Sequence, residues 1–144
     1  MTGVSPRGNI AGLHSTGDRG PPPEGAPIPL PESEPVDRLS THVLDVSAGK
    51  PAEGIPVVLV RDTDQAVLGR GTTDADGRVA RLNDEPIPPG DVALTFDVDA
   101  YMSRTHGTVF HPRITVHVRL DGHRAHYHLP VLAGPFSHTT YLGS

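Results

Sequence analysis

Histidine is the residue type that could give this 144-residue chain its chemistry. The sequence holds nine histidines but no cysteine and no tryptophan. Imidazole has the unperturbed pKa closest to neutrality, so it serves in acid–base catalysis and in metal binding. The absence of cysteine removes thiolate nucleophiles, disulfides and cysteine-ligated zinc. The chemistry to expect is therefore that of imidazoles which the fold brings together.

Two histidines stand two residues apart in the segment AHYHLPVL, residues 125–132. Successive side chains of a β-strand point to opposite faces, so His126 and His128 share one face with Pro130. The opposite face carries the residues expected in the core: Ala125, Tyr127, Leu129 and Val131. The segment thus predicts two imidazoles side by side on a sheet surface that is not bulk core.

A third histidine, His42, lies in LSTHVLDV, residues 39–46, on a face shared with Leu44 and Val46. A His-x-His pair with a distant histidine also suits a metal ion, because residues i and i+2 of a strand point the same way. No acidic residue or fourth histidine is obviously placed in these strands. A metal site is therefore an alternative, and we expect none.

The other histidines are expected to be structural or exposed, because they lie in the N-terminal extension, beside turns or opposite core positions: His14, His106, His111, His117, His123 and His138. Arg78 follows the Asp-Gly turn of TTDADGR. Its residue type and place fit either a solvent-exposed turn arginine or a guanidinium that holds a planar, electron-rich substrate by paired hydrogen bonds.

Short strands must position these residues. Apolar alternation between turn signals predicts strands at 39–46, 55–60, 66–73, 90–98, 114–120, 125–132 and 138–144. In two of them the expected core positions are Val92, Leu94, Phe96, Val98, Ile114, Val116, Val118 and Leu120. One short helix is expected at 99–107. Seven to eight short strands with one helix predict an all-β fold, a two-sheet β-sandwich.

The chain divides into an extension and one domain. Residues 1–37 contain eight prolines and six glycines with almost no apolar periodicity. Such a composition buries too little surface to offset its ordering entropy, so we expect a flexible N-terminal extension over 1–37 and a single domain over 38–144.

Overall charge and hydropathy exclude some partners. The formal net charge is −5 and the pI is about 5.9, which argues against nucleic acid as a partner. No apolar run approaches the roughly 18 residues of a membrane span, and residues 1–30 lack the apolar stretch of a signal peptide. A cytoplasmic location is therefore expected.

Three blocks of the sequence, in order and at matching spacing, resemble the transthyretin-like family and, within it, the 5-hydroxyisourate hydrolases. They are LSTHVLDVSAGKPAEGIPVVLV, TTDADGR and HYHLPVLAGPFSHTTYLGS, and FHPRITVHV is similar as well. The resemblance covers residues 39–144. Only the first 37 residues fall clearly outside it.

This resemblance implies a transthyretin-like β-sandwich assembled as a homotetramer, a dimer of dimers, with active sites at the dimer–dimer interface. The implied reaction is ring-opening amide hydrolysis of 5-hydroxyisourate, a small-molecule substrate made from urate, without a metal or other cofactor. By their place in the motifs, His42, Arg78 and His128 are expected to be catalytic. Which histidine takes the proton from water is left open.

The last four residues, Tyr141 to Ser144, fall on a tetrapeptide that reads Tyr-Arg-Gly-Ser in the hydrolases. We expect Tyr141 and Ser144, together with His126, to bind the substrate. Leu142 stands where that family has arginine. If strand alternation continues to the end, Leu142 points away from the face that Tyr141 occupies.

Three other functions fit parts of the pattern. Leu142 is compatible with an enzyme redirected to a substituted isourate or to another lactam or lactone. A non-catalytic ligand-binding module would use the same channel, as transthyretin does, but would have no need of His42, Arg78, His128 and Tyr141. A histidine-based metalloprotein is the third.

Overall fold

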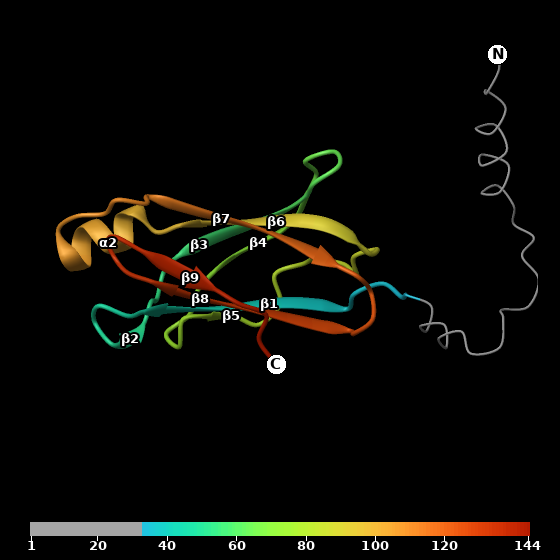
Figure 1. Cartoon of the computed structure of the whole chain (residues 1–144), viewed down its shortest axis with the longest axis horizontal. Coiled ribbons are helices and arrows are strands. Elements are labelled where there is room, and N and C mark those ends of the chain that lie inside the picture. Colours follow the sequence, from blue (N-terminus) through green and yellow to red (C-terminus); the bar gives the residue numbers. More distant parts are fainter. Residues whose placement is uncertain (1–32) are drawn as a thin grey trace, which may run out of the picture. The chain divides into compact units, whose positions relative to one another are not determined.

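The computed structural model describes residues 33–144, which form nine strands and one helix (Figure 1). The strands are β1 (Arg38–Asp45), β2 (Lys50–Pro51), β3 (Pro56–Arg61), β4 (Val67–Thr72), β5 (Arg78–Val79), β6 (Gly90–Asp97), β7 (Arg113–Leu120), β8 (His126–Ala133) and β9 (His138–Thr140). The helix is α2 (Asp99–His106). The all-β class and the single short helix are confirmed.

The strands form two sheets that face each other as a sandwich (Figure 1). One sheet has the order β2-β1-β8-β9, with β5 also paired to β1, and the other has the order β4-β3-β6-β7. All pairings are antiparallel except that of β1 with β8, which is parallel over eight residue pairs from Arg38–His126 to Asp45–Ala133. This parallel pair brings together residues that lie 88 positions apart.

The core fills the space between the sheets, and alternation selects its residues. In β6 the inward positions Val92, Leu94 and Phe96 are each at most 1% exposed, and Val98, directly after the strand, is equally buried. In β7, Ile114 and Leu120 are buried, while Val116 and Val118 pack half-buried against the core. The predicted inward faces of both strands are therefore confirmed, and removal of this apolar surface from water stabilises the sandwich.

Some local features differ from the sequence-based expectation. The two-residue strands β2 and β5 lie in segments expected to be loop and turn, because each extends the pairing of β1 by two residues. Ala125, expected in the core, is exposed because β8 begins one residue later, at His126.

Helix α2 ends at His106, one residue before the predicted end, and packs against the sandwich through two buried side chains. Gly107 adopts a left-handed conformation with φ 78°, which favours glycine, and its amide donates to the Ser103 carbonyl. Burial of Tyr101 and Met102 orients the helix against the sandwich. The helix therefore closes one end of the core.

The carboxylate of Asp45 joins the end of β1 to α2. It is fully buried and accepts hydrogen bonds from Tyr101 Oη and His106 Nε2, each at 2.8 Å. The amides of Ser47 and Ala48 donate to its second oxygen at 3.0 and 2.9 Å. We call Asp45, Tyr101 and His106 the inner cluster. Together, the two side chains and the two amides give the buried carboxylate four hydrogen-bond donors. Without them, burial of this charge would be costly.

Ionisation of the inner cluster follows from these contacts. Burial opposes the charge on Asp45, but hydrogen bonds from His106, the Ala48 amide and Tyr101 outweigh it and hold the pKa of the carboxyl below its usual range. Burial, together with the neighbouring Asp45, raises the pKa of Tyr101 to about 12. The tyrosine therefore stays a hydrogen-bond donor across the physiological pH range.

Most of the predicted N-terminal extension, residues 1–32, lies outside the described residues. Residues 33–37 are described, and Val36 is fully buried and exchanges backbone hydrogen bonds with Ile87. The boundary at residue 37 stays a prediction. Among residues 33–144, no helix has the length and apolar character needed to cross a membrane.

Candidate active site

The parallel pair of β1 and β8 sets two rows of side chains side by side on the outer face of the five-stranded sheet. Its register places Ser40 beside His128, with the Arg38–His126 and His42–Pro130 pairs on either side. Because alternate side chains share a face, all of these point away from the core. We call Arg38, Ser40, His42, His126 and His128 the outer row.

Ser40 is the centre of the outer row. Its Oγ lies 2.6 Å from His126 Nε2 and 2.7 Å from His128 Nδ1. The residue is only 5% exposed, so its hydroxyl is held between the two imidazoles. The histidine pair predicted from the sequence is thus real, and one hydroxyl joins its members.

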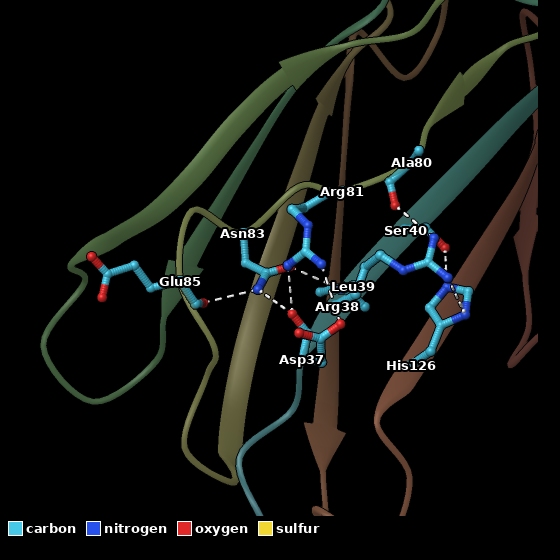
Figure 2. Close-up of polar contacts among 9 residues, drawn as sticks. All are labelled: Asp37, Arg38, Leu39, Ser40, Ala80, Arg81, Asn83, Glu85 and His126. Atoms are coloured by element: carbon cyan, nitrogen blue, oxygen red, sulfur yellow. Dashed lines mark hydrogen bonds and ion pairs between the residues drawn. The ribbon is translucent and has the colours of Figure 1, made fainter.

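Arg38 fixes the outer end of the pair. Its Nη2 lies 3.1 Å from His126 Nδ1, and its Nη1 donates to the Ala80 carbonyl at 3.2 Å. Figure 2 shows the guanidinium between the Ala80 carbonyl and the His126 ring. Both ring nitrogens of His126 are therefore engaged, one by Arg38 and one by Ser40.

The start of β1 is held by the buried side-chain amide of Asn83. Asn83 is 1% exposed, and its Oδ1 accepts from the Leu39 amide at 2.9 Å. Its Nδ2 donates to the carbonyls of Asp37 and Glu85 at 3.0 and 2.8 Å (Figure 2). Because these bonds grip the backbone on both sides of residue 38, they fix where the Arg38 side chain begins.

A hollow of about 350 Å³ opens over the outer row. Its polar lining comes from four segments of the chain: Arg38, Ser40, Thr41, Arg78, His126, His128 and Ser144. His42 lies beside it, opposite Arg78 in the register of β1 and β5. The structure therefore gathers five of the six predicted site residues: His42, Arg78, His126, His128 and Ser144.

The surroundings of both imidazoles of the hollow lower their pKa values, which favours the neutral form. Burial lowers the pKa of His126, and Arg38 lowers it further, against an opposing effect of Asp37. Burial also lowers the pKa of His128, and neighbouring groups that carry or can gain positive charge add to the effect: Arg78, His126, His42 and Arg38. Neutral imidazoles beside guanidinium groups can exchange protons with a substrate or water while the cations attract developing negative charge.

The C-terminal segment packs directly on His128. Gly143 forms an isolated bridge with it, and the Gly143 amide donates to the His128 carbonyl at 2.8 Å. A Cβ added at Gly143 would lie 2.8 Å from His128 Cδ2 and 3.0 Å from the Pro130 ring. The absence of a side chain at residue 143 is what lets the backbone lie against the imidazole and places Ser144 at the hollow.

Tyr141 is the predicted site residue that does not line or adjoin the hollow over the outer row; it borders a second hollow, which His128 also lines. Tyr141 and Leu142 are 55% and 59% exposed, and both border this second hollow of about 360 Å³ beside β7. The expectation that alternation would separate them does not hold. Strand β9 ends at Thr140, because the register places Pro130 opposite Tyr141 and proline has no amide to continue the ladder.

The other described histidines lie away from the hollow. His117 is exposed and faces Asp62 at 3.4 Å, while His123 faces Asp121 at 3.8 Å. His111 and His138 pack edge to face with their rings 5.0 Å apart. Within residues 33–144, no three His, Asp or Glu side chains gather as a metal-binding group.

Sequence reasoning missed Arg38 and Ser40. The signal was present, because both precede His42 by an even number of residues and so share its face of the strand. What the sequence does not contain is the register of β1 against β8, which alone places Ser40 between the two histidines.

Comparisons with known proteins agree with this geometry. Residues 39–143 match the model of the HIUase/transthyretin family. A 5-hydroxyisourate hydrolase of Salmonella typhimurium is 37% identical over 109 residues, which cover 74% of this chain and 80% of that protein.

Two solved structures are similar throughout the sandwich. The 5-hydroxyisourate hydrolase of Klebsiella pneumoniae has a TM-score of 0.67 at 36% identity, covering 74% of this chain and 99% of that one. Sea bream transthyretin in complex with thyroxine has a TM-score of 0.67 at 30% identity, covering 74% and 94%. The same sandwich thus occurs both in a hydrolase and in a thyroxine-bound protein.

Proposed function

The chain belongs to the HIUase/transthyretin family, and from that premise we propose that it hydrolyses 5-hydroxyisourate by opening a cyclic amide. The fold by itself does not choose between a hydrolase and a ligand carrier, since both kinds of relative match it. The choice is made by the curated hydrolase relatives and by the side chains around the hollow, which suit catalysis.

The observation that carries this proposal is the outer row of imidazoles beside Arg78. An imidazole that is neutral at neutral pH can accept a proton from water, which makes the water nucleophilic. A guanidinium at the same hollow stabilises the negative charge that develops on a carbonyl oxygen under attack. A carrier of an apolar ligand would gain nothing from this combination, because it buries polar groups that the ligand cannot match.

The reaction balances with these groups alone. Water forms a bond to the ring carbonyl carbon while a histidine, His42 or His128, takes one of its protons. The carbon–nitrogen bond of the ring then breaks, and the leaving nitrogen receives that proton back. The product carries a new carboxyl group, which ionises to solvent. Arg78 holds the substrate and the oxyanion throughout.

Substrate binding is assigned to residues around the hollow. Ser144 borders it and can contact the substrate directly. The sequence predicts that His126 binds substrate as well, but both of its ring nitrogens are engaged within the protein, so we assign it a supporting place. Tyr141 would reach a site only where another subunit brings its exposed ring to the outer row.

We infer a homotetramer, a dimer of dimers, with the sites at the dimer–dimer interface. Its support is the apolar surface that a single chain leaves open at the β7 and β9 edges, where Tyr141 and Leu142 are more than half exposed. Sedimentation equilibrium at micromolar concentration should give four times the mass of one chain. A monomer that is fully active would contradict this assembly.

We also propose that the protein acts in the cytoplasm. Its motivation is the sequence, which has no signal-peptide pattern in residues 1–30. Fractionation of cells that express the full chain should recover it with cytosolic markers, and recovery with the membranes would contradict the proposal.

The decisive experiment follows 5-hydroxyisourate directly. Urate oxidase generates the substrate in the cuvette, and its ultraviolet decay is recorded with and without the protein. We expect clear acceleration, and a loss of about 10²–10⁴-fold in kcat for His42→Asn or His128→Asn. An exposed histidine offers a matched control, since His117→Asn should leave turnover unchanged. Intact turnover in both catalytic variants would disprove these roles.

A second function is favoured by one residue. Leu142 stands where the resemblance implies an arginine, so a substituted isourate or another lactam or lactone is the alternative substrate. If the full chain does not accelerate the decay of 5-hydroxyisourate, this alternative replaces the first proposal. A panel of cyclic amides and lactones, followed by product mass, then identifies the substrate.

A further inference from the structure

The outer row contains a hydrogen-bonded relay whose direction is set at one end. Arg38 contacts His126, His126 contacts Ser40, and Ser40 contacts His128, at 3.1, 2.6 and 2.7 Å. The groups differ in what they can donate. This difference fixes the position of every proton along the relay.

Arg38 fixes the first proton position. A guanidinium donates hydrogen bonds and cannot accept them, so His126 Nδ1 must offer its lone pair to Nη2. A neutral His126 then carries its proton on Nε2. That nitrogen, 2.6 Å from Ser40 Oγ, donates to the hydroxyl oxygen.

Ser40 determines the direction of the next hydrogen bond, the one to His128. Having accepted from His126, its hydroxyl has one proton to donate, and within the described part of the chain its other partner is His128 Nδ1. In the reverse arrangement both imidazoles would present N–H groups to a hydroxyl that is 5% exposed, and its proton would have no acceptor. His128 Nδ1 is therefore an acceptor, and its proton sits on Nε2.

The surrounding charges favour the neutral state that this direction requires. The side chains that shift the pKa values of the two imidazoles are mostly positive or able to become positive: Arg38 and His42 on β1 and Arg78 on β5. The one carboxylate side chain among them is Asp37, before β1. Together with burial, the basic side chains hold the pKa values of His126 and His128 below the usual range. Asp37 acts only against the shift at His126.

We propose that Arg38 and Ser40 are positioning residues that hold His128 as the neutral, Nε2-protonated tautomer, so that His128 donates a hydrogen bond to the substrate oxygen and His42 carries the proton. The tautomer is a property of the resting protein. The division of roles rests on the proposed hydrolysis.

The proton then follows one route. His42 takes it from water as the water oxygen bonds to the carbonyl carbon. The imidazolium of His42 returns it to the ring nitrogen as the carbon–nitrogen bond breaks. His128 keeps its proton throughout and, with Arg78, stabilises the oxyanion, as a neutral imidazole does when its site keeps it uncharged.

The test measures protons on ring nitrogens in the full chain without substrate. Long-range ¹⁵N–¹H correlation spectra near pH 7.5 should show His128 protonated at Nε2 and bare at Nδ1. Ser40→Thr keeps a hydroxyl and should preserve this pattern. Ser40→Asp supplies only acceptors to both imidazoles and should place a proton on His128 Nδ1. A native His128 protonated at Nδ1, or a Ser40→Asp spectrum like the native one, overturns the proposal.

Turnover provides the second measurement. Ser40→Ala should lower kcat about tenfold with a smaller change in KM, since the loss of one positioning hydrogen bond is expressed in the reacting complex. Ser40→Thr should restore most of kcat, and Arg38→Lys should retain more than Arg38→Met because lysine still donates. Arg61→Met, which alters an exposed arginine elsewhere, should behave like the native chain.

The two proposals fail in different ways. If the native chain leaves 5-hydroxyisourate untouched while the spectra show the expected tautomer, the proposed substrate is wrong and the relay stands. If the native chain is active but Ser40→Ala keeps full kcat and the native tautomer, the relay is wrong and the hydrolase stands.

Discussion

Strand β1 carries one polar cluster on each of its faces, and the histidines of the two clusters have different hydrogen-bond partners. On the inward face, His106 meets the buried carboxylate of Asp45 at 2.8 Å. On the outward face, His126 and His128 meet a hydroxyl and guanidinium groups, and no carboxylate side chain of residues 33–144 hydrogen-bonds to either ring. The partners of the imidazoles thus differ between the two faces, a buried carboxylate on one and a hydroxyl and a guanidinium on the other.

Position along the strand decides which cluster a residue joins. Asp45 is an odd number of residues from Ser40, so the two point to opposite sides of the sheet. The inner cluster is sealed against the core and helix α2, where a charge is tolerated only because four donors satisfy it. The outer row opens to a hollow and keeps neutral, exchangeable sites there. We therefore expect changes to the inner cluster to affect stability and changes to the outer row to affect turnover.

The largest effect should come from breaking the inner cluster. Asp45→Ala leaves Tyr101 Oη, His106 and two backbone amides without their acceptor, and the loss of one partner of a buried pair costs about 3–5 kcal/mol of unfolding free energy. Urea denaturation followed by circular dichroism measures it. Asp64→Ala, which removes an exposed partner of Arg61, should cost less than about 1 kcal/mol. Equal costs for the two variants would contradict a structural inner cluster.

A smaller effect, expressed in turnover as well as in stability, should follow from crowding the outer row. Gly143→Ala places a Cβ 2.8 Å from His128 Cδ2, so either the imidazole or the chain end must shift. Overpacking of this kind costs about 1–3 kcal/mol, which corresponds to roughly a tenfold loss of kcat for each 1.4 kcal/mol. The unfolding free energy should fall by no more than about 1–3 kcal/mol, because the same crowding strains the folded protein.

The control for this variant is Ser137→Ala, an exposed change in the turn before β9. It should leave kcat and stability near the native values. If Gly143→Ala lowered the unfolding free energy and spared kcat, the assignment of the C-terminal segment to the site would be incorrect.

The two clusters should also separate in the pH dependence of stability. His126 and His128 have lowered pKa values in the folded protein, so the unfolded chain binds more protons as the pH falls below about 6.5, and stability declines there. Asp45 also has a lowered pKa, so its contribution is present above the unfolded value of about 3.9 and is lost as the pH falls below it. Each proton contributes at most about 1.4 kcal/mol per pH unit, and less for the partly exposed histidines.

Substitutions show which groups cause the loss of stability in each of the two pH ranges. His126→Gln with His128→Gln should flatten the decline between pH 7 and 5 and keep the steeper loss below pH 4. Asp45→Asn should weaken the loss below pH 4 and keep the decline above it. Denaturation curves at half-unit pH intervals measure both, and a single decline that neither variant alters would show that other groups dominate.

The sequence predicted the individual strands better than their mutual arrangement. Alternation within β6, β7 and β8 follows from local apolar pattern, and it placed His126 and His128 on one face correctly. The family resemblance then singled out His42 and Arg78, which the structure places opposite each other. Local patterns hold this information because a strand sorts its own side chains regardless of its neighbours.

The rest depends on pairing between distant segments, which no local pattern specifies. Ser40 and Arg38 join the site only because β1 runs parallel to β8 in one particular register. Tyr141 and Leu142 border the same hollow because the amide missing at Pro130 ends the ladder at Thr140. Both outcomes are set by long-range hydrogen bonding.

The smallest expected effect comes from restoring the residue that the family resemblance would place at 142. The Leu142 side chain is 59% exposed and borders the hollow beside β7, which His128 also lines but Arg78 does not. An exposed substitution of this kind changes free energies by about 0.5 kcal/mol or less, so Leu142→Arg should alter kcat/KM for 5-hydroxyisourate by about twofold or less. The measurement is the same ultraviolet decay, with Leu142→Lys as a second cation at that position. A large gain with arginine would mean that residue 142 reaches a substrate across a subunit boundary, and that leucine has moved this enzyme toward another ring. Turnover would then depend on the C-terminal segment of a second chain as well as on the outer row of the first.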